Sequence, residues 1–288
     1  MPRKHRKKII LGAVVLLVAL LLWALDVRLA IRNYEVNSNK ITSPVRLVLV
    51  TDLHSCKWGK DQQKLVDAVI EQQPDAVLLG GDIFDDKVPD TNAELFLKGI
   101  ADLYPCYYVT GNHEYWSGQR DFAVKMEILE RYHVTILNGE SELLTVGGQS
   151  INICGVDDPD AYMVADDPSA VVSFAEQLEQ VSTQAQNGHF TVLLSHRPER
   201  FVDYVSNGFD LVLSGHAHGG QWRIPLLLNG LYSPNQGLFP QYAGGRYEQD
   251  GTIMVVSRGL ARESTIVPRI FNRPELVVVD LMPQEVQK

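Results

Sequence analysis

Two histidines separated by one residue follow an apolar run in the C-terminal half of the chain. His216 and His218 come directly after residues 211–214 and Gly215. The run predicts a buried strand, and the glycine predicts a turn at its end. On a turn, two imidazoles at this spacing can converge on one metal cluster. This stretch alone is equally compatible with a pair of surface histidines in a polar loop.

Four earlier apolar runs end in the same way, each in a short polar motif. The residues in these motifs are Asp52 and His54, Asp82, Asn112 and His113, and His196. Singly, His196 could be a structural histidine and Asp82 a turn carboxylate after glycine. Sites in α/β folds gather at the carboxyl ends of strands, so five such motifs in one chain favour one shared site.

The donor atoms of these residues are typical of a particular class of metal ion. Mixed Asp, His and Asn ligands suit Mn²⁺, Fe or Zn²⁺ better than an all-oxygen Ca²⁺ site. Seven such groups exceed the needs of one tetrahedral ion and fit two ions that share a carboxylate. Two metal ions about 3.5–4 Å apart can clamp the attacking and leaving oxygens of a phosphoryl displacement. The residues therefore predict hydrolytic chemistry at phosphorus.

The elements that must position these residues alternate between strands and helices. Apolar runs predict strands at residues 46–50, 75–79, 106–109, 134–137, 142–146, 151–156, 190–194, 211–214, 253–256 and 275–279. Helical spacing predicts helices at 63–72, 91–102, 121–132 and 169–184, and a long irregular loop is expected at 222–245. The alternation indicates an α/β fold, and the later strands, which lack intervening helices, predict a second, more antiparallel sheet.

Composition excludes some classes of partner and cross-link. Residues after position 30 hold 20 Lys and Arg against 34 Asp and Glu, a formal charge of −14. That charge repels phosphate backbones, so no nucleic-acid partner is expected. Cys56, Cys106 and Cys154 are too few for a disulfide framework and are expected to be buried free thiols.

The N-terminus combines a basic cluster with an apolar run. Residues 1–8 are rich in Lys and Arg, and residues 9–25 are uninterrupted apolar residues that include Trp23. Such a run is close to the shortest that spans a bilayer as a helix. A cleaved signal peptide and a buried core helix are the alternatives, but no small-residue cleavage motif follows, and charges flank the run. We expect a single-pass signal-anchor in residues 1–30, a cytoplasmic N-terminus, and an extracytoplasmic catalytic domain in residues 31–288.

The ordered set of motifs resembles that of the calcineurin-like metallophosphoesterases. The motifs are Asp52-Leu53-His54, Gly81-Asp82-Ile83-Phe84-Asp85, Gly111-Asn112-His113-Glu114, His196 and Gly215-His216-Ala217-His218. Gly219-Gly220-Gln221 and Ser257-Arg258-Gly259-Leu260 resemble a membrane-anchored branch that includes a UDP-2,3-diacylglucosamine pyrophosphatase. The resemblance implies a two-sheet β-sandwich flanked by helices, the αββα arrangement, here preceded by a transmembrane helix.

The resemblance also implies a role for each site residue. The implied ligands are Asp52, His54 and His218 for one metal ion, Asn112, His196 and His216 for the other, and Asp82 for both. His113 would protonate the leaving group or stabilise charge on the phosphoryl oxygens, and Asp85 would orient a ligand. The implied cofactors are two divalent metal ions, Mn²⁺ first and Fe or Zn²⁺ next, with a metal-bound hydroxide as the attacking group.

The expected substrate is a membrane or envelope phosphoester, and a phosphodiester or pyrophosphate is favoured over a monoester. Residues 222–245 contain the apolar residues Leu226, Leu227, Leu228, Leu231, Leu238 and Phe239. These could form an apolar rim that faces the bilayer and admits a lipid-linked substrate, but we favour packing against the sheets. Asp157 and Asp158 at a strand end are candidates for further site residues, but we favour a role in capping a loop. The rival function is a membrane-tethered metal-binding or scaffold protein on an inactive phosphoesterase fold, although no ligand is missing.

Overall fold

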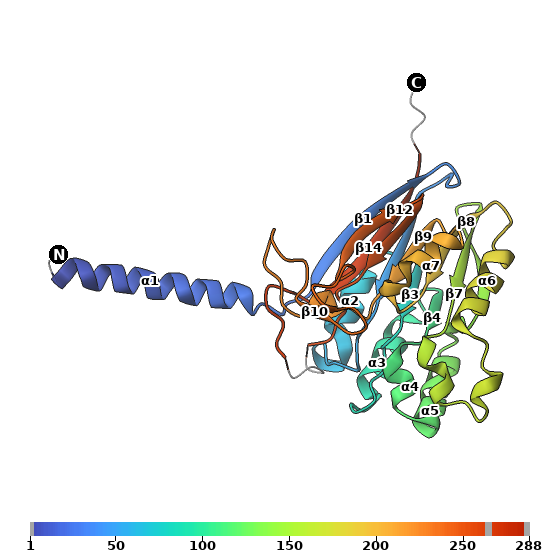
Figure 1. Cartoon of the computed structure of the whole chain (residues 1–288), viewed down its shortest axis with the longest axis horizontal. Coiled ribbons are helices and arrows are strands. Elements are labelled where there is room, and N and C mark those ends of the chain that lie inside the picture. Colours follow the sequence, from blue (N-terminus) through green and yellow to red (C-terminus); the bar gives the residue numbers. More distant parts are fainter. Residues whose placement is uncertain (1–2, 263–266, 285–288) are drawn as a thin grey trace.

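Two six-stranded mixed sheets stack face to face in the computed structural model, which describes residues 3–262 and 267–284 (Figure 1). In spatial order, the first sheet contains β1 (Ala30–Ser38), β14 (Glu275–Pro283), β2 (Val45–Val50), β3 (Ala76–Gly80), β4 (Cys106–Val109) and β5 (Thr135–Ile136). The second contains β12 (Gly245–Gln249), β13 (Thr252–Val256), β9 (Leu211–Ser214), β8 (Phe190–Leu194), β7 (Gln149–Gly155) and β6 (Glu140–Val146).

The strands are apolar on both faces because each sheet is covered on both sides. Leu47 and Leu49 of β2 point between the two sheets, and Val48 and Val50 point to the outer helices. The helices over the first sheet are α2 (Gln63–Ile70), α3 (Thr91–Ile100) and α5 (Gln119–Arg131), and those over the second are α6 (Phe174–Gln184) and α7 (Phe201–Ser206). This arrangement confirms the α/β fold with flanking helices.

The strand directions refine the expectation of a more antiparallel second sheet. The second sheet has two antiparallel pairs, β12 with β13 and β6 with β7, whereas the first has one, β14 with β2. The central pairs β13–β9, β9–β8 and β8–β7 are parallel. Both sheets therefore present the carboxyl ends of parallel strands to one edge of the sandwich.

Several boundaries differ from those predicted. The helix expected from residue 169 begins at Phe174, because Ser173 caps it and the Glu176 carboxylate accepts a hydrogen bond from the Ser173 backbone N–H (2.9 Å). Strand β1 was not predicted, since it is an edge strand with many exposed polar residues. The short helix α4 (Asn112–Trp116) was not predicted either.

The expected loop at residues 222–245 contains a small hairpin, β10 (Tyr232–Ser233) with β11 (Gly237–Leu238), and reaches the start of β12. The prediction that its apolar residues pack against the sheets is wrong for four of them. Leu226, Leu227, Leu238 and Phe239 are exposed, whereas Leu228 and Leu231 are half-buried. Leu226 and Phe239 have positive φ (69° and 57°), a conformation typical of tight turns.

Helix α1 (Arg3–Ala24) projects from the domain as an isolated rod (Figure 1). Its span Lys7–Ala24 has a mean hydropathy of 2.3, and only 6% of that span is buried, which rules out the buried core helix. By length and composition α1 can cross a membrane, and a signal sequence has the same character. Its end is joined to the domain, since the Phe271 backbone N–H donates to the Ala24 carbonyl (2.7 Å).

The core between the sheets sets the stability of the sandwich. Leu213 is fully buried there, so Leu213→Ala should reduce the free energy of unfolding by about 2–5 kcal/mol through lost burial and a residual cavity. Leu143 on edge strand β6 is 53% exposed, and Leu143→Ala should change stability by less than about 0.5 kcal/mol. Denaturant unfolding in detergent measures both values, and equal losses would contradict this assignment of the core.

Candidate metal centre

The polar motifs predicted at strand ends meet at one edge of the sandwich. The loops after β2 and β3 are bonded to each other, since Asp52 N–H donates to the Gly81 carbonyl (3.0 Å) and His54 N–H to the Asp82 carbonyl (2.9 Å). The second sheet joins them there, because His216 N–H donates to Asp52 Oδ1 (2.9 Å). Residues from both sheets thus share one site.

The backbone at this edge is held in an unusual conformation. Asp52, His54, Asp82, His216 and His218 all have positive φ, between 46° and 64°. Residues other than glycine adopt this left-handed region at a cost, and such residues cluster at functional sites. The surrounding hydrogen bonds and close packing must therefore hold these five side chains in place.

Gly259 shows how closely the loops pack. Its φ is +70°, and a Cβ there would lie 2.5 Å from Asp52 Cβ. The adjacent Leu260 N–H donates to the Thr51 carbonyl (3.1 Å). Only glycine combines this conformation with this approach, so the motif around Gly259 supports the loop that carries Asp52.

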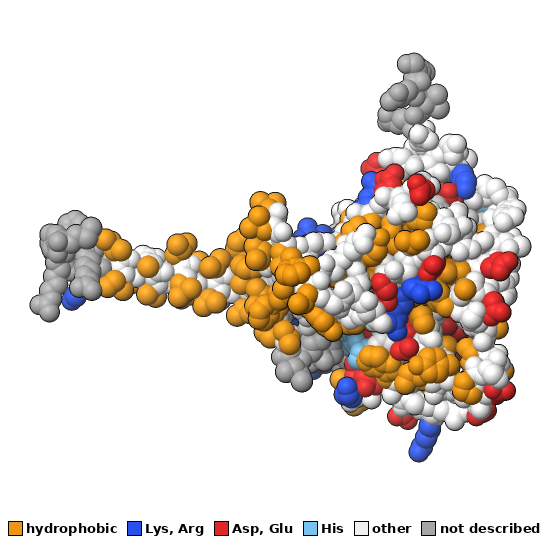
Figure 2. Space-filling view, viewed as in Figure 1, with side chains coloured by type: hydrophobic (Ala, Val, Ile, Leu, Met, Phe, Trp, Pro, Cys, Tyr) orange, Lys and Arg blue, Asp and Glu red, His pale blue; other side chains and the backbone are white. Residues whose placement is uncertain are grey.

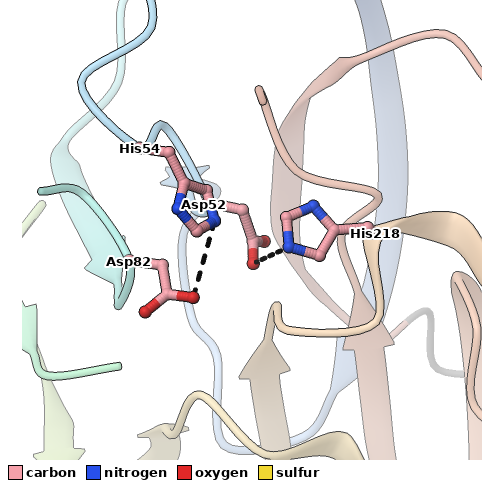
Figure 3. Close-up of side chains that lie close together, drawn as sticks. All are labelled: Asp52, His54, Asp82 and His218. Carbon is pink, nitrogen blue, oxygen red and sulfur yellow. Dashed lines mark ion pairs between the residues drawn. The ribbon is translucent and has the colours of Figure 1, made fainter. Parts of the chain in front are cut away.

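Two clusters of donor side chains share one carboxylate. Asp52, His54, Asp82 and His218 form the first, and Asp82, His196 and His216 form the second. In the first cluster, His54 Nε2 lies 3.5 Å from Asp82 Oδ2, and His218 Nε2 lies 3.6 Å from Asp52 Oδ1 (Figure 3). In the second, His196 Nε2 lies 3.1 Å from the same Asp82 oxygen. Asp82 therefore belongs to both clusters.

Unpartnered buried atoms at this site match the requirements of metal ions. Among the seven predicted ligand residues, six hold a buried side-chain oxygen or nitrogen that makes no hydrogen bond: Asp52 Oδ2, His54 Nε2, Asp82 Oδ2, Asn112 Oδ1, His196 Nε2 and His218 Nδ1. Leaving so many buried polar atoms unsatisfied is costly. Mixed carboxylate, amide and imidazole donors suit divalent ions of borderline character, so the residues present fit two such ions.

Asn112 and His113 are positioned by the start of α4. The backbone N–H of His113 donates to Asp82 Oδ1 (2.9 Å), which brings α4 against the shared carboxylate. Glu114, to which sequence reasoning gave no role, is buried and accepts hydrogen bonds from the backbone N–H groups of Asp82 (3.0 Å) and Gly111 (2.8 Å). Burial, reinforced by repulsion from Asp82, raises the pKa of Glu114 to about 7.

The His113 ring stands at the border between the clusters and solvent. Its Nδ1 lies 2.6 Å from Asp86 Oδ1, and its side chain is 21% exposed. Among the described residues no hydrogen bond engages Nε2. A carboxylate on Nδ1 fixes the orientation of the ring. Sequence reasoning did not select Asp86, because nothing in the sequence distinguishes it from the neighbouring Asp85.

Asp85 contacts a predicted ligand and stays outside both clusters that share Asp82. Its Oδ2 lies 2.9 Å from His54 Nδ1, which leaves His54 Nε2 for the site. Burial opposes its ionisation, but hydrogen bonds from His54 and the Lys87 and Val88 backbone lower the pKa of Asp85 to about 2. The contact fixes the orientation of the His54 ring.

Arg197 and Asn235 are site residues that sequence reasoning missed. Arg197 is buried and ion-pairs with Asp158, with Nη2 2.6 Å from Asp158 Oδ1. Its Nη1 donates to Asn235 Oδ1 (2.8 Å), and that oxygen also lies 2.8 Å from His216 Nε2. Asp158 also caps the turn Pro159–Met163, as expected, by accepting from Asp160 N–H (3.0 Å). The one signal in the sequence was that Arg197 directly follows His196, a predicted ligand.

A cleft of about 650 Å³ opens on the same site. His113 and His218 line one part of it, and Trp222, Leu231 and Tyr232 line another. Pro234 and Val267 add to the apolar part of its wall. The cleft therefore joins the candidate metal ligands to an apolar surface.

Comparisons with known proteins agree with this geometry. The family model for calcineurin-like phosphoesterases matches residues 45–220. An uncharacterized metallophosphoesterase of Helicobacter pylori is 29% identical over 262 residues, which cover 88% of this chain and 64% of that protein. The phosphodiesterase YaeI of Escherichia coli is 25% identical over 190 residues, 64% of each chain.

A solved structure supports the fold. The NAD nucleotidase of Haemophilus influenzae superimposes with a TM-score of 0.53 at 16% identity, covering 76% of this chain and 46% of that one. At this identity the likeness shows the fold alone. The chain thus spans less than two thirds of the length of the H. pylori relative and of this structure.

The buried ion pair of Arg197 should matter more than an exposed one. Arg197→Met leaves the Asp158 carboxylate buried without its partner, so the free energy of unfolding should fall by about 3–5 kcal/mol. Arg200 pairs with Asp203 at the surface, with both side chains 44% exposed, and Arg200→Met should cost less than about 1 kcal/mol. Thermal unfolding of the two variants makes the comparison; similar losses would show that Arg197 has no special structural role.

Proposed function

This chain belongs to the calcineurin-like phosphoesterase family, and we propose that it is a dinuclear metal-dependent phosphohydrolase that acts on a phosphodiester or pyrophosphate bond. The observation that carries the proposal is the pair of donor clusters that share Asp82. Asp52, His54 and His218 are the ligands of one metal ion in this proposal, Asn112, His196 and His216 those of the other, and Asp82 bridges. Six of these seven residues, all except His216, hold an unpartnered buried oxygen or nitrogen, which supports their role as ligands.

Two divalent ions held in this way would supply Lewis acidity at phosphorus and a water of lowered pKa. We assign Mn²⁺ first and Fe or Zn²⁺ next, because the donors mix carboxylate oxygen with imidazole nitrogen. The protein's own part is to hold two buried carboxylates, Asp52 and Asp82, in one place. Their partners for that task are the backbone N–H groups of His216 and His113.

His113 is the proposed proton donor to the leaving group. Its ring lines the cleft, and the Asp86 contact at Nδ1 directs Nε2 away from that carboxylate. A positioned imidazolium can donate to a leaving oxygen or stabilise charge on the phosphoryl oxygens. Trp116 packs against the same ring, with centroids 4.8 Å apart, and limits its movement.

The substrate that best suits the cleft is a phosphoester with an apolar group. The wall beyond the histidines is formed by Trp222, Leu231, Tyr232 and Pro234. An apolar group there would bury against aromatic and aliphatic side chains while its phosphate reaches His113. The likeness to a protein named phosphodiesterase favours a diester over a monoester. The pyrophosphate is kept beside it only because of the motif resemblance at Gly219-Gly220-Gln221 and Ser257-Arg258-Gly259-Leu260.

We further propose that α1 is an uncleaved membrane anchor, with residues 1–30 as tail and anchor and residues 31–288 as the catalytic domain. The supporting observations are its apolar span and the basic residues that precede it. Positive charge is retained on the cytoplasmic side, which places the domain on the outer face of the cell membrane. The domain then meets envelope phosphoesters.

Hydrolysis should depend on added metal. Full-length protein in detergent, treated with a chelator, should lose activity toward bis(p-nitrophenyl) phosphate and regain it when Mn²⁺ is added. Activity toward p-nitrophenyl phosphate under the same conditions should be lower. Hydrolysis unaffected by chelation would contradict the dinuclear site, and two bound metal ions with no turnover of any phosphoester would favour the rival scaffold function.

His113 should separate turnover from metal binding. His113→Ala should lower kcat by about 10²–10⁴-fold, because a proton donor is lost, while metal content stays near that of the unmodified protein. His133→Ala is the matched control, since His133 is exposed and has no place in the site. Kinetics with elemental analysis tests the pair, and full activity in the His113 variant would disprove its role.

A further inference from the structure

Six exposed apolar side chains crowd one surface of the domain, which we call the apolar rim. They are Trp222, Ile224, Leu226, Leu227, Leu238 and Phe239. Leu226 is 105% exposed and Leu227 is 85% exposed, so nothing in the described chain covers them. Hydrophobic side chains gather where α1 meets the domain (Figure 2). Exposed apolar surface of this extent marks contact with another apolar body.

A short segment ties the apolar rim to the end of α1. The Phe271 backbone N–H donates to the Ala24 carbonyl (2.7 Å), and the Trp23 and Phe271 rings meet edge to face at 4.9 Å. One residue earlier, the Ile270 carbonyl accepts from Arg223 N–H (2.9 Å), next to Trp222. The rim therefore lies beside the point where α1 leaves the domain.

The tip of the apolar rim pairs part of its backbone internally. Ile224 and Leu228 exchange hydrogen bonds (3.1 and 2.8 Å), and Leu227 N–H donates to the Ile224 carbonyl (3.0 Å). Pro225 has no N–H to satisfy. Leu226 holds a positive φ of 69°, a strained conformation that directs a leucine into open space. A turn of this kind can enter an apolar layer without exposing many unpaired donors.

Charge distribution distinguishes a bilayer from a protein partner. Residues 224–245 contain no Asp, Glu, Lys, Arg or His, which matches the uncharged span of α1. Arg28 precedes β1, Arg32 lies in it, and Arg273 Nε donates to the Arg28 carbonyl (2.9 Å). Arg28 and Arg273 share one acidic partner, Asp26 (2.8 and 3.4 Å), so this cluster keeps a net positive charge. In a bilayer, the uncharged apolar tip would contact acyl chains, and the arginines behind it would lie at the depth of the headgroup phosphates.

We propose that the apolar rim is a second membrane-contact surface, which enters the interfacial layer of the bilayer that α1 crosses. This inference rests on the proposed position of α1 as a membrane anchor. One helix alone leaves the domain free to tilt, whereas a second contact fixes its orientation. Trp222 belongs both to the rim and to the wall of the 650 Å³ cleft, so the cleft faces the lipid surface. The amphiphilic substrate can then enter from the bilayer.

The test places an environment-sensitive fluorophore on single introduced cysteines in the full-length protein. The variants are Leu227→Cys and Leu238→Cys in the rim, Leu17→Cys in α1, and Leu143→Cys on β6 as the matched exposed control. The native cysteines are buried, and unfolding midpoints check that each variant folds. The protein is reconstituted in vesicles of phosphatidylethanolamine and phosphatidylglycerol that carry nitroxide lipids labelled near the headgroup or near the chain end.

Nitroxides near the headgroup should quench most of the fluorescence of the labels at positions 227 and 238. Nitroxides near the chain end should quench the label at position 17. Neither kind should quench the label at position 143. Quenching at Leu17 without quenching at Leu227 and Leu238 would overturn the rim proposal and leave the anchor in place. No quenching at any position would overturn both. A concentration-dependent blue shift of the rim labels without lipid quenching would show that a second copy covers the rim, which also overturns the proposal. None of these readouts depends on activity.

Discussion

The Asp82 carboxylate is the group on which the rest of this structure depends. It follows a strand of one sheet, faces histidines from both sheets, and accepts the backbone N–H of His113. Burial opposes its charge, yet the imidazoles of His196 and His54 keep its pKa well below the usual range. A buried carboxylate is tolerated only where partners compensate it, so both sheets and α4 must arrive at one edge.

The sequence predicted that these residues would lie together because they come directly after apolar runs. A strand must end where its apolar run ends, and the carboxyl ends of parallel strands share an edge, so Asp52, Asp82 and His216 could be placed before any coordinates. These residues have left-handed backbone, which turns the chain sharply directly after each strand. The motifs are short for this reason. The loops are tightly turned and leave little room for insertion.

Other features lay beyond sequence reasoning for physical reasons. Arg197 meets Asp158 and Asn235 across 39 and 38 residues, and no local pattern encodes such pairing. Leu226 is exposed and Leu213 is buried, although both are leucines in apolar runs. The difference in burial comes from the backbone geometry, which the residue type does not reveal. Apolar and polar residues alternate poorly in β1. The strand lies at the edge of its sheet, pairs only with β14, and leaves many side chains exposed.

The proposals place chemistry and membrane on one face of the molecule, with Asp82 as the shared centre of the metal site. The most direct test is metal content of the full-length protein and of Asp82→Asn, measured by elemental analysis at matched protein concentration. The account predicts two metal ions per chain in the first, and reduced occupancy of both sites in the second. Retention of one fully occupied site in the variant, or a single metal ion in the unmodified protein, would contradict a bridging Asp82.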